Sequence, residues 1–295
     1  MTVAVARNPY ATNVSGSLIA AARRLGVPVR PVDLPSLRLG IGPRGEEAVT
    51  DSAGCVAADS LAPYLLFGFP AAVHALRALA RTTRTQNPVD GVLLADDKAA
   101  AAYRLARSGV PQVRTEICPF DAGLVTAVAA EIGYPVVVKR AHGARGRWVR
   151  RAAGQEALAT ALAELAAEGP GALIVQPEVV ECAGTSIRAV VTGGRLLAVT
   201  ERQATAPEWR SNIAGGAAQR RVELTGEESD LVLAAARAIG LGHAGVDLLR
   251  TRQGPRVLEV NSCPDFTSMQ PHYTEDLAEA VLLASLEDGP PARLS

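Results

Sequence analysis

The sequence predicts a fold of the α/β class, in the broad sense that includes α+β, and three observations carry this prediction. Short runs of β-branched residues alternate with helical runs along most of the chain. The run Pro135–Lys139 reads Pro-Val-Val-Val-Lys, which is typical of a buried strand. Further along, two apolar runs flank Arg252–Pro255, and this pattern indicates a β-hairpin. We therefore expect helices packed against sheets.

Residues 1–94 read as a small βα domain that carries no glycine-rich phosphate fingerprint. Residues 35–60 are rich in glycine, proline and serine, and we expect them to be irregular. The expected elements are strands at Thr2–Ala6, Val27–Val32 and Gly91–Leu94 and helices at Val14–Leu25 and Ala71–Arg84.

The rest of the chain continues the alternation, without an internal repeat or a coiled-coil pattern. Helices are expected near Asp97–Arg107, Ala122–Ile132, Gln155–Ala167 and Glu227–Ile239. Strands are expected near Pro135–Lys139, Trp148–Arg151, Ala172–Gln176, Ser186–Val191, Arg195–Thr200, Ala244–Arg250 and Arg256–Asn261. The proline-containing end, Gly289–Ser295, is expected to be a loose tail.

Composition excludes several classes of function. Thirty basic residues balance thirty acidic ones among 295, which argues against a general binder of nucleic acid. The apolar stretch Leu61–Leu79 is interrupted by proline, histidine and arginine, so no membrane span is expected, and the start MTVAVARNPY does not resemble a secretion signal. The four cysteines lie far apart and form no CxxC pair, which favours reduced thiols in a cytoplasmic protein. These cysteines are Cys55, Cys118, Cys182 and Cys263.

The hairpin carries a group of acidic and amide side chains. Folding it about Gln253 places Asp247 opposite Glu259, and Asn261 shares their face because side chains alternate along a strand. Opposed carboxylates repel each other unless a cation lies between them, and oxygen ligands suit Mg²⁺. A solvated polar face, or another register, remains the alternative. The apolar neighbours expected on the opposite face are Val246, Leu248, Leu258 and Val260.

Two lysines and two glycines indicate a phosphate-binding site. Lys139 ends a very apolar strand, where a lysine needs an anion or an exit to solvent. Gly143 and Gly146 follow it and permit a tight loop whose N–H groups can face phosphate. Lys98 is a second candidate, although an ordinary solvated lysine explains it equally well.

The segments between the glycine loop and the hairpin add further candidates. Gln176–Glu178 ends a strand in a proline-containing bend, which suits either adenine binding by the backbone or a simple hinge. Arg188, Arg202 and Arg210 have guanidinium groups suited to phosphate or carboxylate, while each alone is more often a surface residue. The histidines show no ligand spacing, and only His142 is a weak candidate for a phosphate contact.

Together these motifs resemble the ATP-grasp ligases, and the RimK-like branch in particular, over residues 90–265. That branch includes ribosomal-protein glutamate ligases and carrier-protein ligases of lysine and arginine biosynthesis. The resemblance implies a three-part ATP-grasp fold: an N-terminal domain (1–94), a central lid (95–176) and a C-terminal part with the metal site (177–295). The motifs are ADDK, YPVVVKRAHGARGR, VQPEVV, SIRAVV, ERQA, EWRSNIAGGA, AGVDLL and LEVNSCPDF.

The resemblance also implies roles for residues. Lys98 and Lys139 correspond to lysines that bind nucleotide phosphates, and Asp247, Glu259 and Asn261 to ligands of Mg²⁺, with Mn²⁺ as an alternative metal. The expected nucleotide contacts further include Gly143, Gly146, Gln176, Pro177, Glu178, Ser186, Arg202, Arg210, Ser211 and Asn212. Three features depart from the pattern. Ser186 replaces an acid near the ribose, for which Glu178 or Glu181 could substitute; Pro177 replaces the hinge acid; and the first ninety residues, which help to shape the acceptor site, match weakly. The loop before Trp148 lacks the third glycine common in the glutamate ligases and so resembles the carrier-protein ligases more closely.

The function implied is ATP-dependent ligation of a carboxylate to an amine through an acyl phosphate, with Arg188, Arg202 and Arg210 as catalytic arginines. The expected partners are an amino acid, a peptide or a small acidic carrier protein, and neither nucleic acid nor a membrane. Arg140–Arg151 and Arg81–Arg84 are candidate docking faces for such a carrier, although ordinary solvated charge explains them more simply. By analogy with the family, a dimer or tetramer is expected. Amino-acid biosynthesis and natural-product assembly both remain open. The alternatives are a phosphotransferase and a degenerate nucleotide-binding domain, the latter favoured by Ser186 and Pro177.

Overall fold

The computed structural model describes residues 1–9, 11–62, 69, 72–143, 146–167, 169–182, 184–205, 208–211 and 213–287. Among these residues the strands form four sheets, and helices alternate with the strands along the chain. This mixed architecture confirms the predicted α/β class. The predicted tail Gly289–Ser295 lies outside the described residues. None of the helices within these ranges has the length and hydropathy that crossing a bilayer requires.

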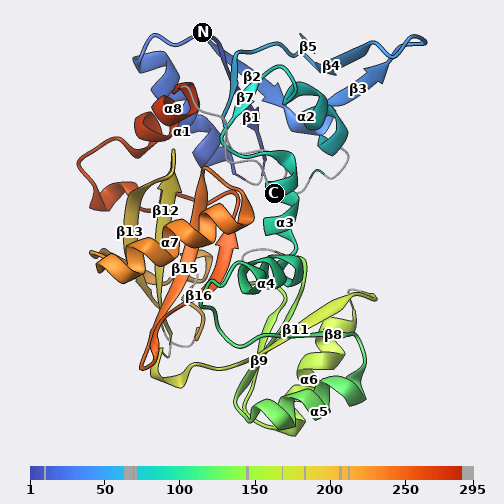
Figure 1. Cartoon of the computed structure of the whole chain (residues 1–295), viewed down its shortest axis with the longest axis vertical. Helices are drawn as coiled ribbons and strands as arrows, with labels where there is room; N and C mark the ends of the chain where they lie inside the picture. The colour runs from blue at the N-terminus through green and yellow to red at the C-terminus, as the bar shows by residue number, and fades with distance from the viewer. Residues whose placement is uncertain are drawn as a thin grey trace.

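The N-terminal region is built around a parallel sheet, as Figure 1 shows. The residues Val-Ala-Val-Ala of the first strand are buried on both faces, as expected for a parallel strand covered on each side. Helix α1 buries Leu18, Ala21 and Ala22 on one stripe. The sheet contains β2 (Val29–Asp33), β1 (Val3–Arg7), β6 (Ser60–Leu61) and β7 (Arg84–Thr85) in that order, with α1 (Thr12–Arg24) and α2 (Val73–Leu79) beside it.

An antiparallel sheet corrects the prediction that residues 35–60 are irregular. It follows the 3-10 turn η1 (Leu34–Ser36) and consists of β3 (Arg38–Ile41), β4 (Glu47–Asp51) and β5 (Gly54–Cys55). These strands are short and mostly exposed, so they lack the apolar alternation by which strands are recognised. The buried carboxylate of Asp51 accepts a hydrogen bond from Arg30 Nη2 at 2.6 Å, which ties this sheet to β2.

The predicted strand Gly91–Leu94 is wrong, because these residues form part of helix α3 (Val89–Asp96). Its buried residues Val89, Val92 and Ala95 recur with helical spacing. Gly91 packs so closely on the end of another helix that an added Cβ would lie 2.9 Å from the Gly240 carbonyl oxygen. Burial against a second helix therefore explains an apolar run that the sequence interpretation assigned to a sheet.

The central region is a four-stranded antiparallel sheet covered by two helices. Strand β8 was not predicted, whereas the other elements confirm the expected ones to within one or two residues. The strand order is β10 (Val149–Ala152), β9 (Val136–Arg140), β11 (Ala172–Pro177) and β8 (Glu116–Pro119). The helices are α5 (Ala122–Ile132) and α6 (Gln155–Ala166), while α4 (Lys98–Arg107) links this region to α3.

A five-stranded antiparallel sheet lies between these two regions in Figure 1. Helix α7 (Gly226–Ile239) packs on it and begins with a capping box between Thr225 and Glu228. Strand β14 and helix α8 (Leu277–Leu286) were not predicted. The strand order is β14 (Ala218–Arg221), β13 (Arg195–Gln203), β12 (Thr185–Thr192), β15 (Ala244–Thr251) and β16 (Gly254–Asn261). Short 3-10 turns occur at η3 (Val180–Cys182), η4 (Ile213–Gly215) and η5 (Gln270–His272).

Candidate active site

A cavity of about 730 Å³ lies where the three regions meet. Its walls come from the start of α1, the start of α4, the β9–β10 loop, the end of β11 and one face of the five-stranded sheet. A volume of this size is within the range of small-molecule and cofactor sites. Except for Asn212, which the structure does not describe, every residue predicted to bind nucleotide or metal lines this cavity. Glu181, the second alternative for the ribose contact, is not part of the cavity wall, whereas Glu178 is.

The acidic hairpin has the predicted pairing at its functional end. Asp247 lies directly opposite Glu259, and Gly245 opposite Asn261. The turn is centred between Arg252 and Gln253, half a position from the predicted centre, and a β-bulge after Asp247 restores the predicted pairing. The bulge also turns Leu258 toward the cavity, so the prediction that Leu258 packs on the opposite face is wrong. Val246, Leu248 and Val260 are buried in the core, as expected.

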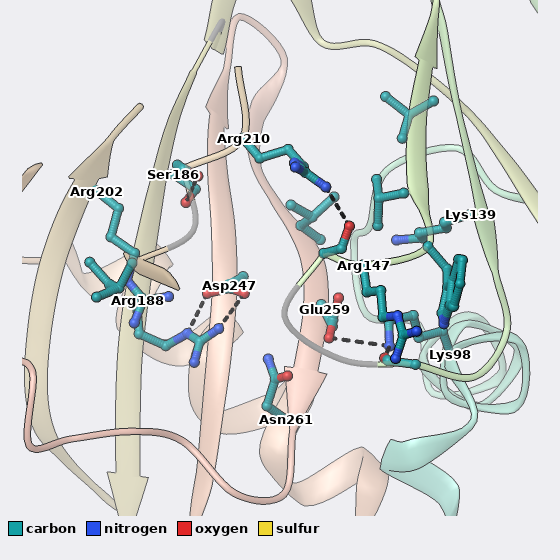
Figure 2. Close-up of a pocket in the computed structure, with 18 of the residues that line it drawn as sticks. Lys98, Lys139, Arg147, Ser186, Arg188, Arg202, Arg210, Asp247, Glu259 and Asn261 are labelled. Carbon is teal, nitrogen blue, oxygen red and sulfur yellow. Dashed lines mark hydrogen bonds and ion pairs between the residues drawn. The ribbon is translucent and has the colours of Figure 1, made fainter. Parts of the chain in front are cut away.

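A cation already lies beside Asp247. Arg188 on β12 donates two hydrogen bonds to this carboxylate, one of them from Nη2 to Oδ2 at 2.6 Å (Figure 2). Burial alone would raise the pKa of Asp247, but the Arg188 cation outweighs burial and lowers it. The sequence interpretation proposed Arg188 as a catalytic arginine and did not foresee this pair. Between β12 and β15, Arg188 and Asp247 are cross-strand neighbours.

The Asn261 amide connects the two acidic residues to Arg188. With its nitrogen toward Glu259 it donates to Oε1 at 2.9 Å, and its oxygen then accepts from Arg188 Nη2 at 3.2 Å. Within the described ranges, no three histidine, cysteine, aspartate or glutamate side chains form a metal cluster. Two carboxylates and an amide oxygen are nevertheless a donor set that fits Mg²⁺ when the remaining ligands are water and phosphate oxygens.

The two candidate lysines approach the acidic hairpin from the neighbouring elements. Lys98, the first residue of α4, lies with Nζ 3.7 Å from Glu259 Oε1 and donates to the Gly143 carbonyl. Lys139 on β9 is only 6% exposed. Burial lowers the pKa of Lys139, while the negative charge of Glu259 opposes this shift. Figure 2 shows both lysines on the side of the cavity opposite Arg188, so the acidic residues lie between cations.

The loop between β9 and β10 closes one side of the cavity. Gly143 and Gly146 have φ of +129° and +69°, values that glycine adopts without strain, as expected for a tight loop. A Cβ on Gly143 would lie 2.8 Å from Trp148 Cδ1, so this glycine also lets the indole pack against the loop. The Arg147 guanidinium lies 4.6 Å from the centre of that ring. We call Gly143–Trp148 the glycine loop.

A second loop, Glu208–Ser211, holds the glycine loop in place. Arg210 was predicted to contact phosphate, but its guanidinium donates to the Gly146 carbonyl and, from Nη2, to Glu208 Oε2 at 2.7 Å. Hydrogen bonds from the Arg210 side chain lower the pKa of Glu208 to about 2. Ser186 Oγ on β12 lies 2.5 Å from Ser211 Oγ. This loop is therefore joined both to the five-stranded sheet and to the glycine loop.

Arg202 on β13 differs from the other arginines. It is 6% exposed, and its guanidinium has no hydrogen bond or ion pair with any residue that the structure describes; Nε is buried without a partner. Burial and the nearby Arg188 cation lower the pKa of Arg202 to about 9. A buried cation without a partner is costly unless an anion joins it, so this residue is the clearest indication of an anionic ligand.

The proposed adenine hinge is more fully bonded than the sequence indicated. Glu178 N–H donates to the Pro135 carbonyl at 2.9 Å, and the Glu178 carboxylate binds Arg151 Nε at 2.6 Å. Gln176 Nε2 donates to Thr115 Oγ1 at 2.8 Å. Fewer backbone groups are therefore free at this bend than predicted. The adjacent cavity wall is apolar and suits a flat ring, with Val113, Val137, Val179, Leu249 and Leu258 contributing.

Several features of the site were not recognised in the sequence. Asp265 lines the cavity from the loop after β16, and its negative charge favours the protonated forms of Arg188 and Arg202. The first turn of α1 also lines the cavity. Asp265 is part of the NSCPDF motif and could have been considered, since a carboxylate four residues after a proposed ligand is a plausible neighbour. No local pattern indicates where α1 begins relative to the hairpin.

Other candidates have mainly structural roles. The Arg140 guanidinium donates to the carbonyl oxygens of Leu165, Gly169 and Pro170 and so completes the end of α6. Arg150 pairs with Glu164, and Arg81 with Glu47, so the two proposed basic docking faces offer fewer free cations than predicted. His142 lines the cavity, with Nε2 3.8 Å from Asp97 Oδ2, whereas His243 is fully buried.

Comparison with known proteins identifies relatives of this site. A family model described as a RimK-like ATP-grasp domain matches residues 95–285, which is more than half of the chain. The probable alpha-L-glutamate ligase of Trichodesmium erythraeum is 31% identical over 198 residues, 67% of this chain and 66% of the relative. The probable alpha-L-glutamate ligase 2 of Shewanella frigidimarina is 34% identical over 197 residues, 65% of this chain and 64% of the relative. The chain spans just under two thirds of the length of these relatives.

Solved structures match almost the whole chain. The ATP-grasp ligase PsnB, solved with a variant of its minimal precursor, Mg and ADP, superposes with a TM-score of 0.72 at 18% identity, over 96% of this chain and 97% of PsnB. A RimK-domain ATP-grasp protein of Sphaerobacter thermophilus gives 0.69 at 22% identity, over 97% and 99%. Identities this low show the fold alone. They confirm the ATP-grasp fold, including the N-terminal region that the family model leaves out.

Proposed function

This chain belongs to the RimK-like ATP-grasp family, and from this premise we propose that it is an ATP-dependent ligase that joins a carboxylic acid to an amine. The observation that supports it most strongly is the meeting of Asp247, Glu259 and Asn261 with Lys98 and Lys139 in one cavity. ATP-grasp ligases use ATP and Mg²⁺, and the curated relatives are named as alpha-L-glutamate ligases. We further propose that the chain divides into an N-terminal domain (1–94), a central lid (95–176) and a C-terminal part with the metal site (177–295).

The cavity offers distinct places for the parts of a nucleotide. The apolar wall next to Gln176–Val179 suits adenine, because rings of this kind bind on apolar surfaces with few polar contacts. The phosphates then extend toward Lys98 and Lys139, whose ammonium groups balance their negative charge. Arg147 reaches the same space from the glycine loop.

Asp247, Glu259 and Asn261 would hold Mg²⁺, with Mn²⁺ as an alternative, between the hairpin and the phosphates. When bound, the metal would supply positive charge that polarises phosphoryl oxygens. Arg188 holds Asp247 in place through two hydrogen bonds and keeps its carboxylate ionised. Arg188 is thus proposed to position a metal ligand, in place of the catalytic role expected from the sequence.

In the proposed reaction a carboxylate oxygen attacks the γ-phosphorus of ATP, the bond to the β-phosphate oxygen breaks, and ADP leaves. The amine then attacks the acyl carbon, phosphate leaves and an amide bond forms. Lys139 and Arg202 can stabilise the negative charge of these steps because burial makes each cation electrostatically stronger than in water. Arg210 and the glycine loop exclude water, which would otherwise hydrolyse the acyl phosphate.

The acid is proposed to be an amino acid, a small peptide or the C-terminus of a carrier protein. The test is incubation with ATP, Mg²⁺ and paired acids and amines, with ADP release and product mass followed together. A product with the mass of acid plus amine minus water supports the ligase, and omission of the amine should abolish it. EDTA serves as the metal control. ADP release with a phosphorylated product alone would instead indicate a phosphotransferase.

A further inference from the structure

A buried pair of amide residues, Gln86–Asn87, joins the N-terminal region to the five-stranded sheet, and we call it the junction. It lies between β7 and α3, with Asn87 at 0% exposure and Gln86 at 9%. The Thr85 hydroxyl fixes the Asn87 backbone, because it accepts from Asn87 N–H at 3.2 Å and donates to the Asn87 carbonyl at 3.3 Å. Neither residue of the junction is part of the cavity wall, so its effect on the site must pass through other residues.

The Asn87 carboxamide bonds to both strands of the acidic hairpin. Its Oδ1 accepts from His243 N–H at 2.9 Å, and its Nδ2 donates to the His243 carbonyl at 2.8 Å and to the Ser262 carbonyl at 3.2 Å. The last paired residues at this end of the hairpin are Gly245 and Asn261. The carboxamide therefore bridges the two strands just beyond the point where their own pairing stops.

This bridge fixes the backbone beside a proposed metal ligand. Ser262 directly follows Asn261, and both residues line the cavity. A shift of the Ser262 peptide would carry the Asn261 side chain with it. Such a shift is opposed by the bridge, because a buried amide that loses its hydrogen-bond partners is costly. The position of Asn261 therefore depends on Asn87, although the two side chains belong to different regions of the chain.

Gln86 makes the corresponding contacts away from the hairpin. Its Oε1 accepts from Gly193 N–H in the β12–β13 turn at 2.8 Å, and its Nε2 donates to Ser285 Oγ of α8 at 2.9 Å. Its backbone carbonyl accepts from Gly242 N–H at 2.9 Å. A Cβ on Gly242 would lie only 2.8 Å from that carbonyl oxygen. The two side chains of the junction therefore hold different parts of the sheet, and Asn87 alone holds the hairpin through its side chain.

Helix α3 extends this connection to the other side of the acidic hairpin. It begins just after the junction, contacts β16 and ends just before Lys98. Lys98 Nζ lies 3.7 Å from Glu259 Oε1. Figure 1 shows α3 running from the N-terminal region to α4 beside the five-stranded sheet. One continuous segment of the chain therefore approaches the hairpin both at Ser262 and at Glu259.

We propose that Asn87 is a positioning residue for the Mg²⁺ site: it holds the ends of β15 and β16 so that Asp247 and Asn261 keep the spacing that the metal requires. The inference rests on the proposed function, which supplies the metal. Mg²⁺ demands nearly ideal octahedral geometry, so small shifts of its ligands weaken binding. Substitution of residues that orient metal ligands typically lowers metal affinity about 10- to 100-fold. The N-terminal region thus contributes to metal binding through a side chain that contacts neither metal nor substrate.

The experiment measures ADP binding to the full chain calorimetrically, once with Mg²⁺ and once with EDTA. The ratio of the two dissociation constants reports how far the metal tightens ADP binding, and the affinity of Mg²⁺ for free ADP cancels when variants are compared. Asn87→Leu keeps a similar side-chain volume and removes the three hydrogen bonds to the hairpin. It should reduce the ratio about tenfold, while the ADP affinity in EDTA should stay nearly constant.

Gln86→Leu is the matched control, because it removes buried amide contacts of the same junction that end on the β12–β13 turn and α8. Both variants should lower the urea midpoint, but Gln86→Leu should keep the ratio within about twofold of wild type. A lower midpoint with an unchanged ratio in Asn87→Leu would mean that Asn87 is purely structural and would overturn the proposal. An equal fall of the ratio in both variants would also contradict it, because the effect would then follow stability alone.

Gly242→Ala tests the same end of the hairpin with Asn87 intact, and it decides the question if Asn87→Leu shows no cooperative unfolding. The added Cβ meets the Gln86 carbonyl, so the segment that leads into β15 must move away from the junction. The ratio should then fall as well, again with little change of the ADP affinity in EDTA. A wild-type ratio in this variant, together with a lower urea midpoint, would count against positioning by the junction.

These measurements separate the inference from the function on which it rests. If Mg²⁺ does not tighten ADP binding to the wild type, the metal assignment fails and the inference fails with it. If Mg²⁺ tightens binding equally in wild type and Asn87→Leu, only the positioning role fails. Binding is measured without turnover, so a tenfold fall of the ratio would support the positioning role even if no acid and amine pair gave a product and the ligase function were lost.

Discussion

The face of the five-stranded sheet and the loops that close over it hold their charged groups in different ways. On the sheet, Arg188 and Asp247 are 11% and 15% exposed, come from adjacent strands and share two hydrogen bonds. On the loops, Arg210 and Glu208 are 28% and 22% exposed, and Arg210 reaches the glycine loop through a single backbone carbonyl. The sheet fixes geometry, whereas the loops depend on a few partly exposed contacts.

The sheet and the loops therefore suit two different tasks in the same cavity. Groups that must align with reacting atoms need positions fixed by packing, and strands in a core provide them. A segment that admits substrate and then excludes water must open, so it belongs to the less stable part of a structure. Substitutions on the sheet should therefore change the chemical step or the stability of the whole protein, and substitutions on the loops should change access and nucleotide affinity.

The largest effect is expected for Glu259→Gln. Loss of the carboxylate should lower the rate of ADP release about a hundredfold to a thousandfold, because a ligand for the metal that stabilises the developing charge is removed. The free energy of unfolding should change little, because the Glu259 side chain is 27% exposed and its ion pair with Lys98 Nζ is long, at 3.7 Å. Glu227→Gln, on the exposed start of α7, is the matched control. ADP release within twofold of wild type, about 0.4 kcal/mol, would remove the metal assignment.

The second prediction compares two arginines on neighbouring strands of the sheet. Arg188→Gln leaves the Asp247 carboxylate buried without its cation and should destabilise the protein by about 3–5 kcal/mol. Arg202→Gln removes a buried cation that lacks a partner and should stabilise the protein without substrate by about 1–3 kcal/mol. Urea unfolding without ligand measures both changes. Each variant should lose ligase activity.

Opposite signs of the two stability changes would show that Arg202 is kept for a ligand at a cost in stability, as functional residues often are. Equal destabilisation by both substitutions would mean that Arg202 has a structural partner, and the indication of an anionic ligand beside it would lose its main support. Addition of an anionic ligand that binds beside Arg202 should reverse the sign for Arg202→Gln relative to wild type, because only the intact cation gains from the anion.

The sheet and the loops also differ in how far the sequence predicts them. The pairing of Asp247 with Glu259 follows from strand alternation and a short turn, so local pattern sufficed. The bulge that turns Leu258 inward leaves no mark in the alternation, and the prediction for that residue was wrong. The partner of Asp247 is 59 positions away, at Arg188, and only the strand order brings the two together.

Other errors have the same cause, namely tertiary contacts that a local pattern does not contain. Gly91–Leu94 was expected to be a strand, but a short apolar run can equally belong to a helix that packs against another helix. The pairing of Arg210 with Glu208 is local and could have been considered from the Glu-Trp-Arg spacing, but its contact with Gly146 could not. Whether Asn212 contributes to the site stays a prediction.

The smallest effects are expected for the two contacts that hold the loop Glu208–Ser211, which Arg210→Gln and Ser186→Ala remove separately. Arg210→Gln removes a charge-assisted contact with the glycine loop and should weaken binding of a non-hydrolysable ATP analogue about tenfold. Ser186→Ala removes one neutral hydrogen bond to Ser211 and should weaken it about two- to threefold. Arg220→Gln breaks an exposed pair with Glu201 at the edge of the same sheet and serves as the control.

Limited proteolysis decides whether Arg210 acts by holding the glycine loop or by contacting phosphate. Arg147 is exposed within that loop and offers a cleavage site for trypsin. If Arg210 holds the loop, Arg210→Gln should be cut faster after Arg147 in the absence of nucleotide, because the contact with the Gly146 carbonyl is lost. If Arg210 serves phosphate alone, the rate without nucleotide should equal that of wild type, and only protection by the ATP analogue should differ. The second result would return Arg210 to the role expected from the sequence.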